Sequence, residues 1–305
     1  MRDLLAKRLT ELSQSNPELF LIYGDIGNRL FDEFKTKNNG RYMNAGIAES
    51  SMVTLAAGMA RFGFRPIVYT INSFLYLKAI EQIKIDICYP NLPVILIGTG
   101  SALSYSELGT THHSLEDFGI LSTIPNLQLI SPADSLEVAE SLEWAINSNK
   151  PTYIRLGKKE NLLLHKGELG FKKENFGPFQ ILKFENASAA ILSTGAITGE
   201  AYQAVIDNDL NLDLWSIPQI KPIGEDIFMI LKQYSKLFII EEHNFIGGLG
   251  SMLAALYAQK QVVTPKMFFI NTGDQFHTGL GNIGSAREHL KLDPINLKLI
   301  LKAND

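Results

Sequence analysis

Short apolar runs alternate with amphipathic segments along the whole chain. The runs at 19–23 and 152–156 are continuous, whereas segment 4–12 carries apolar residues at helical spacing. Apolar strands that alternate with helices predict a parallel sheet covered by helices on both faces. The predicted strands are 19–23, 41–44, 66–69, 93–98, 128–130, 152–156, 189–192, 212–215, 237–241 and 267–270, and the predicted helices are 4–12, 49–62, 74–88, 135–147, 198–208, 227–234, 250–258 and 295–302.

The alternation lapses once, between Gly157 and Phe179, where lysines mix with glycines and a proline. A chain of 305 residues suits two domains better than one. We therefore predict an α/β domain with a parallel sheet at 1–160, a linker at 161–182, and a smaller α/β domain at 183–305.

Composition excludes some classes of protein. Apolar residues make up 46% of the chain and charged residues 20%, which is typical of a globular protein and not of a disordered one. The net charge is −4 and no basic run occurs, so we expect no nucleic-acid partner.

Cysteine usage and hydropathy bear on the compartment. Cys88 has no second cysteine to pair with, and it lies in an apolar helical stretch that predicts an inert core thiol. No apolar run is long enough to span a bilayer. These two features favour a soluble protein of the cytoplasm.

The first segment with candidate chemistry is Asn44-Ala45-Gly46-Ile47-Ala48-Glu49, where a strand ends and an acid opens a helix. An acid at this position is stabilised by the exposed amides and the dipole of the helix, so by itself it is typical of a first-turn helix residue.

Segment 41–50 resembles the segment of transketolases and 1-deoxyxylulose-5-phosphate synthases that carries their cofactor-activating glutamate. The resemblance implies that Glu49 is that residue, and that its carboxyl group bonds N1′ of the aminopyrimidine ring of thiamine diphosphate. It also implies the fold of that family, a thiamine-diphosphate-binding-type sheet domain followed by a transketolase C-terminal domain.

Segment 106–117, followed by Ile-Pro-Asn-Leu at 124–127, is similar to the family's Gly-x-Thr-His loop. His112 falls on the family histidine that lines the substrate channel and handles protons, which suits an imidazole that titrates near neutrality. From the residues alone, His112 and His113 read as an exposed, idle pair. We expect His112 to be catalytic and substrate-binding and His113 to be idle. A metal site is not expected, because no third ligand lies at suitable spacing.

Segment 72–83 resembles the family segment whose aromatic side chain packs on the aminopyrimidine ring. We assign this stacking to Phe74, with Tyr76 and Leu77 as alternatives, although the spacing suits core packing of an amphipathic helix equally well. Asp25 falls on the family's strand-end aspartate and is assigned to cofactor binding.

Three cations fall on phosphate-binding positions of the family, namely Arg2, Arg29 and Lys158. Each alone is typical of a solvated surface charge. As a set they would hold a sugar phosphate at the channel mouth.

The diphosphate-binding motif of the family, Gly-Asp-Gly with a downstream Asn, does not occur in this sequence. A diphosphate needs a metal and oxygen ligands to offset its charge. The resemblance therefore implies a partner, an N-terminal transketolase subunit that carries the diphosphate end and most of the Mg²⁺ coordination. We expect this chain to form a homodimer core or an α2β2 heterotetramer with it.

The resemblance predicts transfer of a two-carbon ketol unit from a ketose to an aldehyde. Two departures, Leu108 in place of a sugar-binding Asp and Gly100 in place of a phosphate-contacting His, predict an unusual acceptor. One alternative is a decarboxylating subunit, like deoxyxylulose-phosphate synthase or the β subunit of 2-oxo acid dehydrogenases. Another is a non-catalytic partner subunit. Segment 237–251 also resembles the family, and there we expect a structural or interface role for His243 and not a catalytic one.

Overall fold

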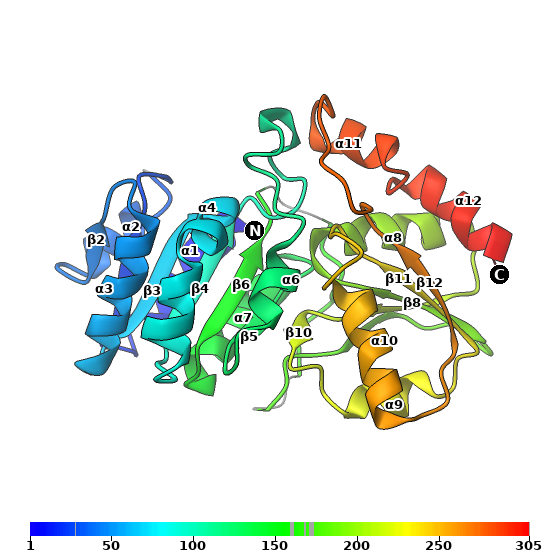
Figure 1. Ribbon diagram of the computed structural model, residues 1–305, viewed down its shortest axis with the longest axis horizontal. Helices are drawn as coiled ribbons and strands as arrows, with labels where there is room; N and C mark the ends of the chain where they lie inside the picture. Colours follow the sequence, from blue (N-terminus) through cyan, green and yellow to red (C-terminus); the bar gives the residue numbers. More distant parts are fainter. Residues whose placement is uncertain (28, 159–161, 168, 171–173, 305) are drawn as a thin grey trace.

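The computed structural model describes residues 1–27, 29–158, 162–167, 169–170 and 174–304. Two α/β parts lie side by side, the first drawn from blue to green and the second from yellow-green to red (Figure 1). This arrangement confirms the predicted fold class, because each part contains its own mainly parallel sheet.

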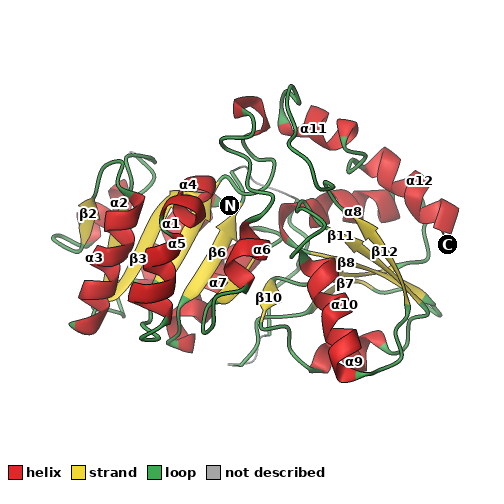
Figure 2. Ribbon diagram, viewed as in Figure 1, coloured by secondary structure: helices red, strands yellow, loops and turns green. Residues whose placement is uncertain are grey.

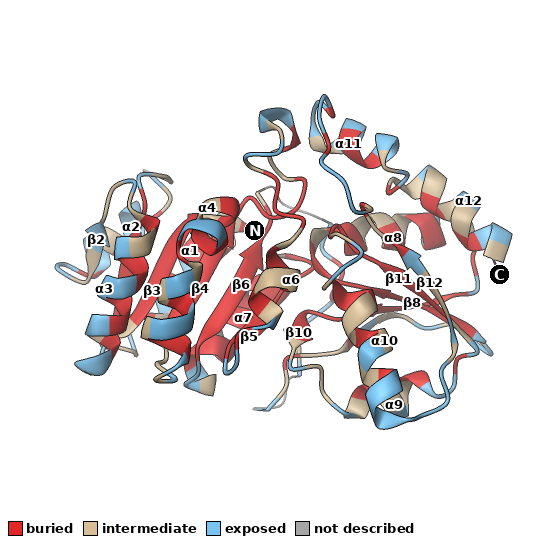
Figure 3. Ribbon diagram, viewed as in Figure 1, coloured by how far each residue is buried: buried red, intermediate tan, exposed pale blue. Residues whose placement is uncertain are grey.

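The first sheet has seven strands in the order β10-β5-β6-β4-β3-β1-β2. Neighbouring residues of one strand point to opposite faces, so Ile67 joins the core beneath α1 and α7 while Val68 joins the core beneath α3 and α4. Both faces are thus covered, and the central strands are buried between the helices, whereas the edge strand β2 is largely exposed (Figure 3). Six of the strands belong to the first part: β1 (Leu19–Tyr23), β2 (Tyr42–Asn44), β3 (Arg65–Ile71), β4 (Ile95–Thr99), β5 (Gln128–Ile130) and β6 (Thr152–Leu156).

The predicted helix 74–88 is wrong as a single element, because it breaks at Ala79, whose backbone has φ −117° and ψ 17°. The hydroxyl of Ser50 donates to the carbonyl of Lys78 at 2.6 Å, which gives that carbonyl a partner outside its own helix. The helices of this part are α1 (Arg2–Leu12), α2 (Asp32–Lys37), α3 (Glu49–Arg61), α4 (Asn72–Lys78), α5 (Ile80–Gln82), the π-helix η1 (Ile83–Cys88), the 3-10 helix η2 (Ser106–Leu108), α6 (Asp117–Ser122) and α7 (Ser135–Ser148).

The second sheet has five strands in the order β12-β11-β8-β9-β7 (Figure 2). Its edge strand β7 (Phe179–Leu182) runs antiparallel to β9 and lies within the stretch that the sequence predicted as linker. The other strands are β8 (Ala189–Ser193), β9 (Asp213–Ser216), β11 (Lys236–Ile240) and β12 (Lys266–Ile270); the helices are η3 (Gly195–Ile197), α8 (Thr198–Ile206), α9 (Asp226–Leu231), α10 (Leu249–Lys260), α11 (Ile283–His289) and α12 (Pro294–Asn304).

One strand of the second part crosses into the first sheet. β10 (Gln219–Lys221) pairs antiparallel with β5, and just before it the amide of Ser131 donates to the carbonyl of Pro218 at 2.7 Å. The outer edge of β5 would otherwise present unpaired backbone groups. The sequence did not predict this strand, which makes the sheet of the first part mixed and not purely parallel.

Two smaller expectations can also be compared with the structure. The thiol of Cys88 is buried, and burial raises its pKa to about 12, in keeping with an inert core thiol. Among the residues that the structure describes, no helix has the length and apolar character needed to cross a membrane.

Candidate active site

The candidate residues of the first part lie on segments that follow the strands of its parallel sheet. Parallel strands bring their carboxyl ends to the same edge, where ligands bind in open α/β sheets. Asp25 follows β1, Glu49 follows β2, Phe74 follows β3, His112 follows β4 and Lys158 follows β6. The order of the strands therefore explains how residues far apart in sequence gather there.

Glu49 is the first residue of α3, and only 5% of it is exposed. One carboxylate oxygen accepts a long hydrogen bond from the Thr70 hydroxyl at 3.5 Å, and the other lies 3.4 Å from the ammonium of Lys78. The start of α3 favours a negative charge at this point. Among the described residues, this buried acid is paired with Lys78, which comes from the end of α4.

Phe74 lies between that ion pair and the histidine loop. The Lys78 ammonium is 4.5 Å from the centroid of the Phe74 ring, and the His112 ring meets the same ring edge-on at 5.2 Å between centroids. Phe74 is half-buried, so part of its ring is accessible. An aromatic face thus lies next to the buried carboxylate.

The loop that carries His112 is held by the start of α4. The Asn72 amide donates to the Ser114 hydroxyl at 2.8 Å, and that oxygen also accepts from the amide of Ala102 at 2.9 Å. His112 itself is half-buried, with Nδ1 2.9 Å from the Thr111 hydroxyl. These contacts fix the loop and place the imidazole beside Phe74.

His113 differs from the exposed pair that the residues alone suggested. Its ring is buried, Nε2 lies 3.4 Å from the carbonyl of Ser106, and burial lowers its pKa. The two neighbouring histidines therefore point to different environments, one toward the accessible edge and one under the loop.

Tyr105 is a site residue that sequence reasoning missed. Its ring lies 6.0 Å from that of His112 and 4.4 Å from the Lys158 ammonium, measured to ring centroids. It also packs on Gly100, where a Cβ would come within 1.8 Å of a ring carbon and where φ is +77°. A side chain at position 100 therefore has no room unless Tyr105 moves.

The three cations that were predicted to bind phosphate have different surroundings in the structure. The Lys158 ammonium is 3.3 Å from a carboxylate oxygen of Glu107. Arg2 lies beside the hydroxyl of Tyr69, where burial raises the phenol pKa to about 12 and the guanidinium opposes that rise. Arg29 is exposed on the segment between β1 and α2, and in the described structure it makes none of these contacts.

Two further predicted residues make contacts of other kinds. Tyr76 is 1% exposed, its ring belongs to the core, and its hydroxyl donates to Glu116 at 3.0 Å. Asp25 is exposed and accepts a long hydrogen bond from the Asn44 amide at 3.4 Å. Of the two aromatic residues considered, only Phe74 offers a ring face next to Glu49.

The contacts above join the central residues into one strip. In order along it are Glu49, Lys78, Phe74, His112, Tyr105 and Lys158. It offers a buried acid, an aromatic face, an imidazole and a cation. A flat nitrogen heterocycle fits the first two, because its edge needs a hydrogen-bond partner and its face an apolar surface.

Among the described residues, no group of three or more metal-ligand side chains occurs.

A second charged cluster lies where the two parts of the chain meet, and the sequence analysis missed most of it. Arg155 donates from Nε to Asp117 at 2.9 Å and from one terminal nitrogen to the carbonyls of Ser114 and Glu242, at 2.7 and 3.0 Å. The sequence signal for this cluster was Arg155 itself, a charged residue inside the otherwise apolar run 152–156.

His243 belongs to the same junction. Its ring stacks on Phe118 at 5.1 Å, and Nε2 accepts from the Phe118 amide at 3.2 Å. Nδ1 lies 2.7 Å from the carbonyl of Asn244. Burial lowers the pKa of His243 to about 4, so the ring is neutral near pH 7. The histidine therefore caps the start of α6 from the second part of the chain.

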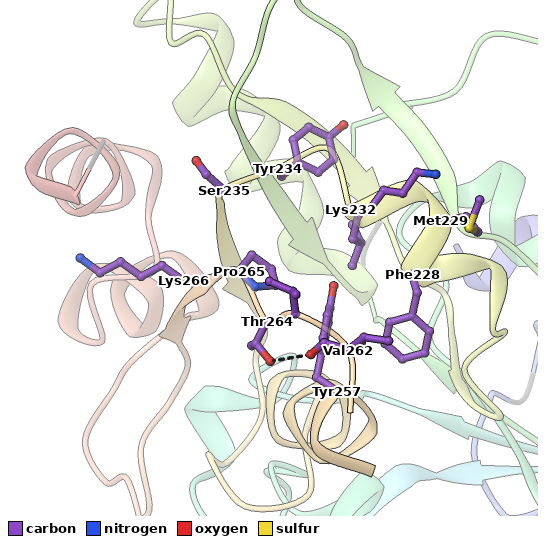
Figure 4. A pocket seen from close by; sticks show the side chains of 12 residues that line it. Phe228, Met229, Lys232, Tyr234, Ser235, Tyr257, Val262, Thr264, Pro265 and Lys266 are labelled. Atoms are coloured by element: carbon purple, nitrogen blue, oxygen red, sulfur yellow. Dashed lines mark hydrogen bonds between the residues drawn. The ribbon is translucent and has the colours of Figure 1, made fainter. Parts of the chain in front are cut away.

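A cavity of about 460 Å³ lies in the second part, away from this strip (Figure 4). Its lining comes from α9, the end of α10 and the segment before β12, and it includes Phe228, Tyr257 and Val262. None of the lining residues carries a carboxyl or imidazole group. The cavity therefore does not offer the acid–base chemistry of the candidate site.

Comparison with known proteins identifies the family. Residues 1–162 match the family described as transketolase, pyrimidine binding domain, and residues 180–274 match transketolase, C-terminal domain. The chain belongs to the transketolase family. The strip from Glu49 to Lys158 lies within the match to the transketolase pyrimidine binding domain.

Within the transketolase family, several relatives are proteins of similar length. An apulose-4-phosphate transketolase subunit of Actinobacillus succinogenes is 33% identical over 223 residues, which cover 72% of this chain and 70% of that one. A putative transketolase C-terminal section of Methanocaldococcus jannaschii is 28% identical over 295 residues, covering 95% and 90%. A 1-deoxy-D-xylulose-5-phosphate synthase of Thermus thermophilus is 30% identical over 299 residues, covering 97% of this chain but 47% of the synthase.

Solved structures agree on the transketolase fold. A split gene transketolase, described as an inactive beta4 tetramer, superimposes with a TM-score of 0.85 at 24% identity, over 99% of this chain and 96% of that one. Transketolase from Leishmania mexicana gives 0.78 at 17% identity, over 98% of this chain and 44% of the longer one.

Proposed function

We propose that this chain is the C-terminal subunit of a two-subunit, thiamine-diphosphate-dependent transketolase. It would transfer a two-carbon ketol unit from a ketose to an aldehyde acceptor. The observation that carries the proposal is the buried Glu49 carboxylate next to the ring of Phe74, with His112 at the edge of that ring. Relatives that are named as a transketolase subunit or as a C-terminal section support the two-subunit form.

Glu49 and Phe74 are the residues that would hold the aminopyrimidine end of thiamine diphosphate, Glu49 at the ring nitrogen and Phe74 on the ring face. When bound, the cofactor supplies the reactive carbon and stores the electron pair of the cleaved bond. The contribution of Glu49 is to hold a proton at the ring nitrogen in a place with little water. Asp25, exposed at the end of β1, would contact the cofactor from the rim of this site.

His112 would move protons to and from the substrate hydroxyls. The contact between its Nδ1 and the Thr111 hydroxyl leaves Nε2 as the atom that exchanges a proton. An imidazole can both donate and accept a proton, which suits it to this role.

Lys158 and Arg2 would bind the phosphate of the sugar, and Arg29 would approach it from the exposed segment after β1. The relative from Actinobacillus succinogenes is named for apulose 4-phosphate, and we infer a sugar phosphate as the substrate class here as well. The half-exposed side chain of Leu108 cannot accept a hydrogen bond, which favours an acceptor that does not need one at that point.

The partner would be an N-terminal transketolase subunit that brings the diphosphate and Mg²⁺ sites. Apolar side chains near Glu49 support such a contact, because Ile47 is 80% and Leu77 57% exposed. We infer an α2β2 assembly around a dimer of this chain, acting in the cytoplasm.

The test is to reconstitute the chain with an N-terminal transketolase subunit from the same organism, together with thiamine diphosphate and Mg²⁺. The proposal expects ketol transfer that needs both subunits and is lost in Glu49→Gln. Pyruvate decarboxylation without ketose cleavage would support the decarboxylating alternative instead. Full activity of the complex with Glu49→Gln would point to a non-catalytic partner subunit.

A further inference from the structure

We propose that Lys78 competes with the aminopyrimidine ring of the cofactor for Glu49 and Phe74, and must swing aside for the ring to bind. The inference rests on the proposed function, because it assumes that Glu49 and Phe74 form the cofactor site. Lys78 would thereby have a specific role in cofactor binding.

The backbone of Lys78 is held close to Glu49 by the break that ends α4. The carbonyl of Lys78 accepts from the hydroxyl of Ser50, the neighbour of Glu49 on α3, at 2.6 Å. The side chain then turns over Phe74, with Nζ 4.5 Å from the ring centroid and 3.4 Å from Glu49 Oε2. One ammonium group thus contacts both the acid and the aromatic face.

A bound heterocycle would need the same two surfaces. A ring that stacks on Phe74 lies ~3.5–4.0 Å above it, the usual separation of contacting carbon atoms. The Lys78 ammonium occupies that layer, and it also takes the carboxylate oxygen nearest to it. Because the lysine is cationic and fills this volume, the ring and the ammonium cannot share the site.

The two partners of this ion pair differ in their freedom to move. The side chain of Lys78 is 51% exposed, whereas that of Glu49 is 6% exposed. A lysine on a flexible stem can exchange its carboxylate partner for water at little cost, but Glu49 cannot reach water. The lysine therefore leaves and the acid stays, so that Lys78 keeps the buried carboxylate paired until the ring replaces it.

The experiment measures binding of thiamine, which lacks the diphosphate and so tests the ring end alone. The free chain is titrated by NMR or calorimetry as wild type, Lys78→Ala, Lys84→Ala and Glu49→Gln. Lys78→Ala should bind thiamine about threefold to tenfold more tightly than wild type, because the competing ion pair is weak. Lys84→Ala removes an exposed lysine six residues further on and should match wild type.

The outcomes separate the two proposals. Unchanged or weaker binding by Lys78→Ala, relative to wild type, overturns the competition. Unchanged binding by Glu49→Gln overturns the proposed cofactor site, whatever Lys78 does. Thiamine binding by none of the variants counts against both. Lys78→Arg keeps the charge and should not gain affinity; a gain equal to that of Lys78→Ala would show that the positive charge is not the competitor.

Discussion

Two charged clusters of this protein are built in opposite ways. At the sheet edge, Glu49 meets Lys78 in one long ion pair whose cationic side chain is 51% exposed. At the junction of the two parts, Arg155 and Asp117 are 3% and 0% exposed and 2.9 Å apart. An exposed ammonium can exchange its carboxylate partner for water, whereas an enclosed ion pair cannot separate without leaving a buried charge unpaired.

The junction cluster gains its rigidity from several elements. Tyr153 on β6 donates its hydroxyl to the Asp117 oxygen that Arg155 also contacts, at 2.7 Å. On the side of the second part, Arg287 on α11 donates to Glu242 and Glu200, at 2.6 and 2.5 Å. Loss of one member would leave others buried and unpaired, whereas loss of Glu49 at the sheet edge would leave only the half-exposed Lys78.

The largest effect on folding is expected from Arg155→Met. The substitution leaves the buried Asp117 carboxylate without its cation, and it should cost about 3–5 kcal/mol of unfolding free energy. Urea denaturation of the free chain measures it. Lys84→Met, at an exposed position, should stay within about 0.5 kcal/mol of wild type. A loss below about 1 kcal/mol for Arg155→Met would show that the junction does not depend on this pair.

Glu49→Gln should do the reverse, with little effect on folding and a large one on catalysis. Because the amide cannot hold the proton in the same way, ketol transfer by the reconstituted complex should fall by about 10²–10⁴-fold. Initial rates at saturating cofactor measure this, and urea denaturation of the free variant should change by less than about 1 kcal/mol. Comparable losses of stability in Glu49→Gln and Arg155→Met would abolish the contrast between the clusters.

His243 makes the stability of the junction depend on pH. Its pKa of about 4 lies below the usual 6.5, so the unfolded chain binds its proton more readily between these values. Its stabilising contribution is complete above pH 6.5 and is lost as pH falls to about 4, by roughly 3 kcal/mol in all. His243→Gln keeps a hydrogen-bond acceptor without the titration.

Glu241 complicates the wild-type curve, because burial raises its pKa to about 7. The contribution of Glu241 to the unfolding free energy depends on pH in the opposite direction to that of His243. It is lost as pH rises from about 4.5 to 7. The measurement is therefore the difference in unfolding free energy between wild type and His243→Gln, at pH 5 and at pH 7. That difference should be smaller at pH 5, and an equal value at both would contradict the assignment.

The smallest effect is expected from Lys158→Met. Its ion pair with Glu107 is at the surface, so unfolding free energy should change by less than about 1 kcal/mol. If Lys158 binds the substrate phosphate, KM for a sugar phosphate should rise by about tenfold with little change in kcat. Steady-state kinetics of the complex decide this, and an unchanged KM would remove Lys158 from the site.

The sequence predicted the strands of both sheets that lie between helices, because their continuous apolar runs reflect burial on both faces. It did not predict β7 or β10, which are short and pair antiparallel at sheet edges. β10 depends on the free edge of β5, some ninety residues earlier in the chain. Such a strand is fixed by a distant partner and not by its own pattern.

The site was predictable where a motif carries it, as for Glu49 and His112, whose chemical roles await the tests above. Tyr105 and Lys78 were not predictable, because their positions depend on contacts with distant segments. The carbonyl of Lys78 at the end of α4 accepts a hydrogen bond from Ser50 on another helix. The burial of His113 under its loop likewise depends on contacts that no local pattern contains.

The strand β10 restricts which fragments and chimaeras of this protein can keep the first sheet intact. A fragment that stops after β6 would lack the strand that covers the edge of β5, and that bare edge would favour association with other chains. An exchange of C-terminal halves between relatives would replace three residues of the recipient's own sheet. Strand β10 follows β7 to β9 in the sequence but belongs to the first sheet in space. A single cut in the gene therefore cannot separate the two sheets.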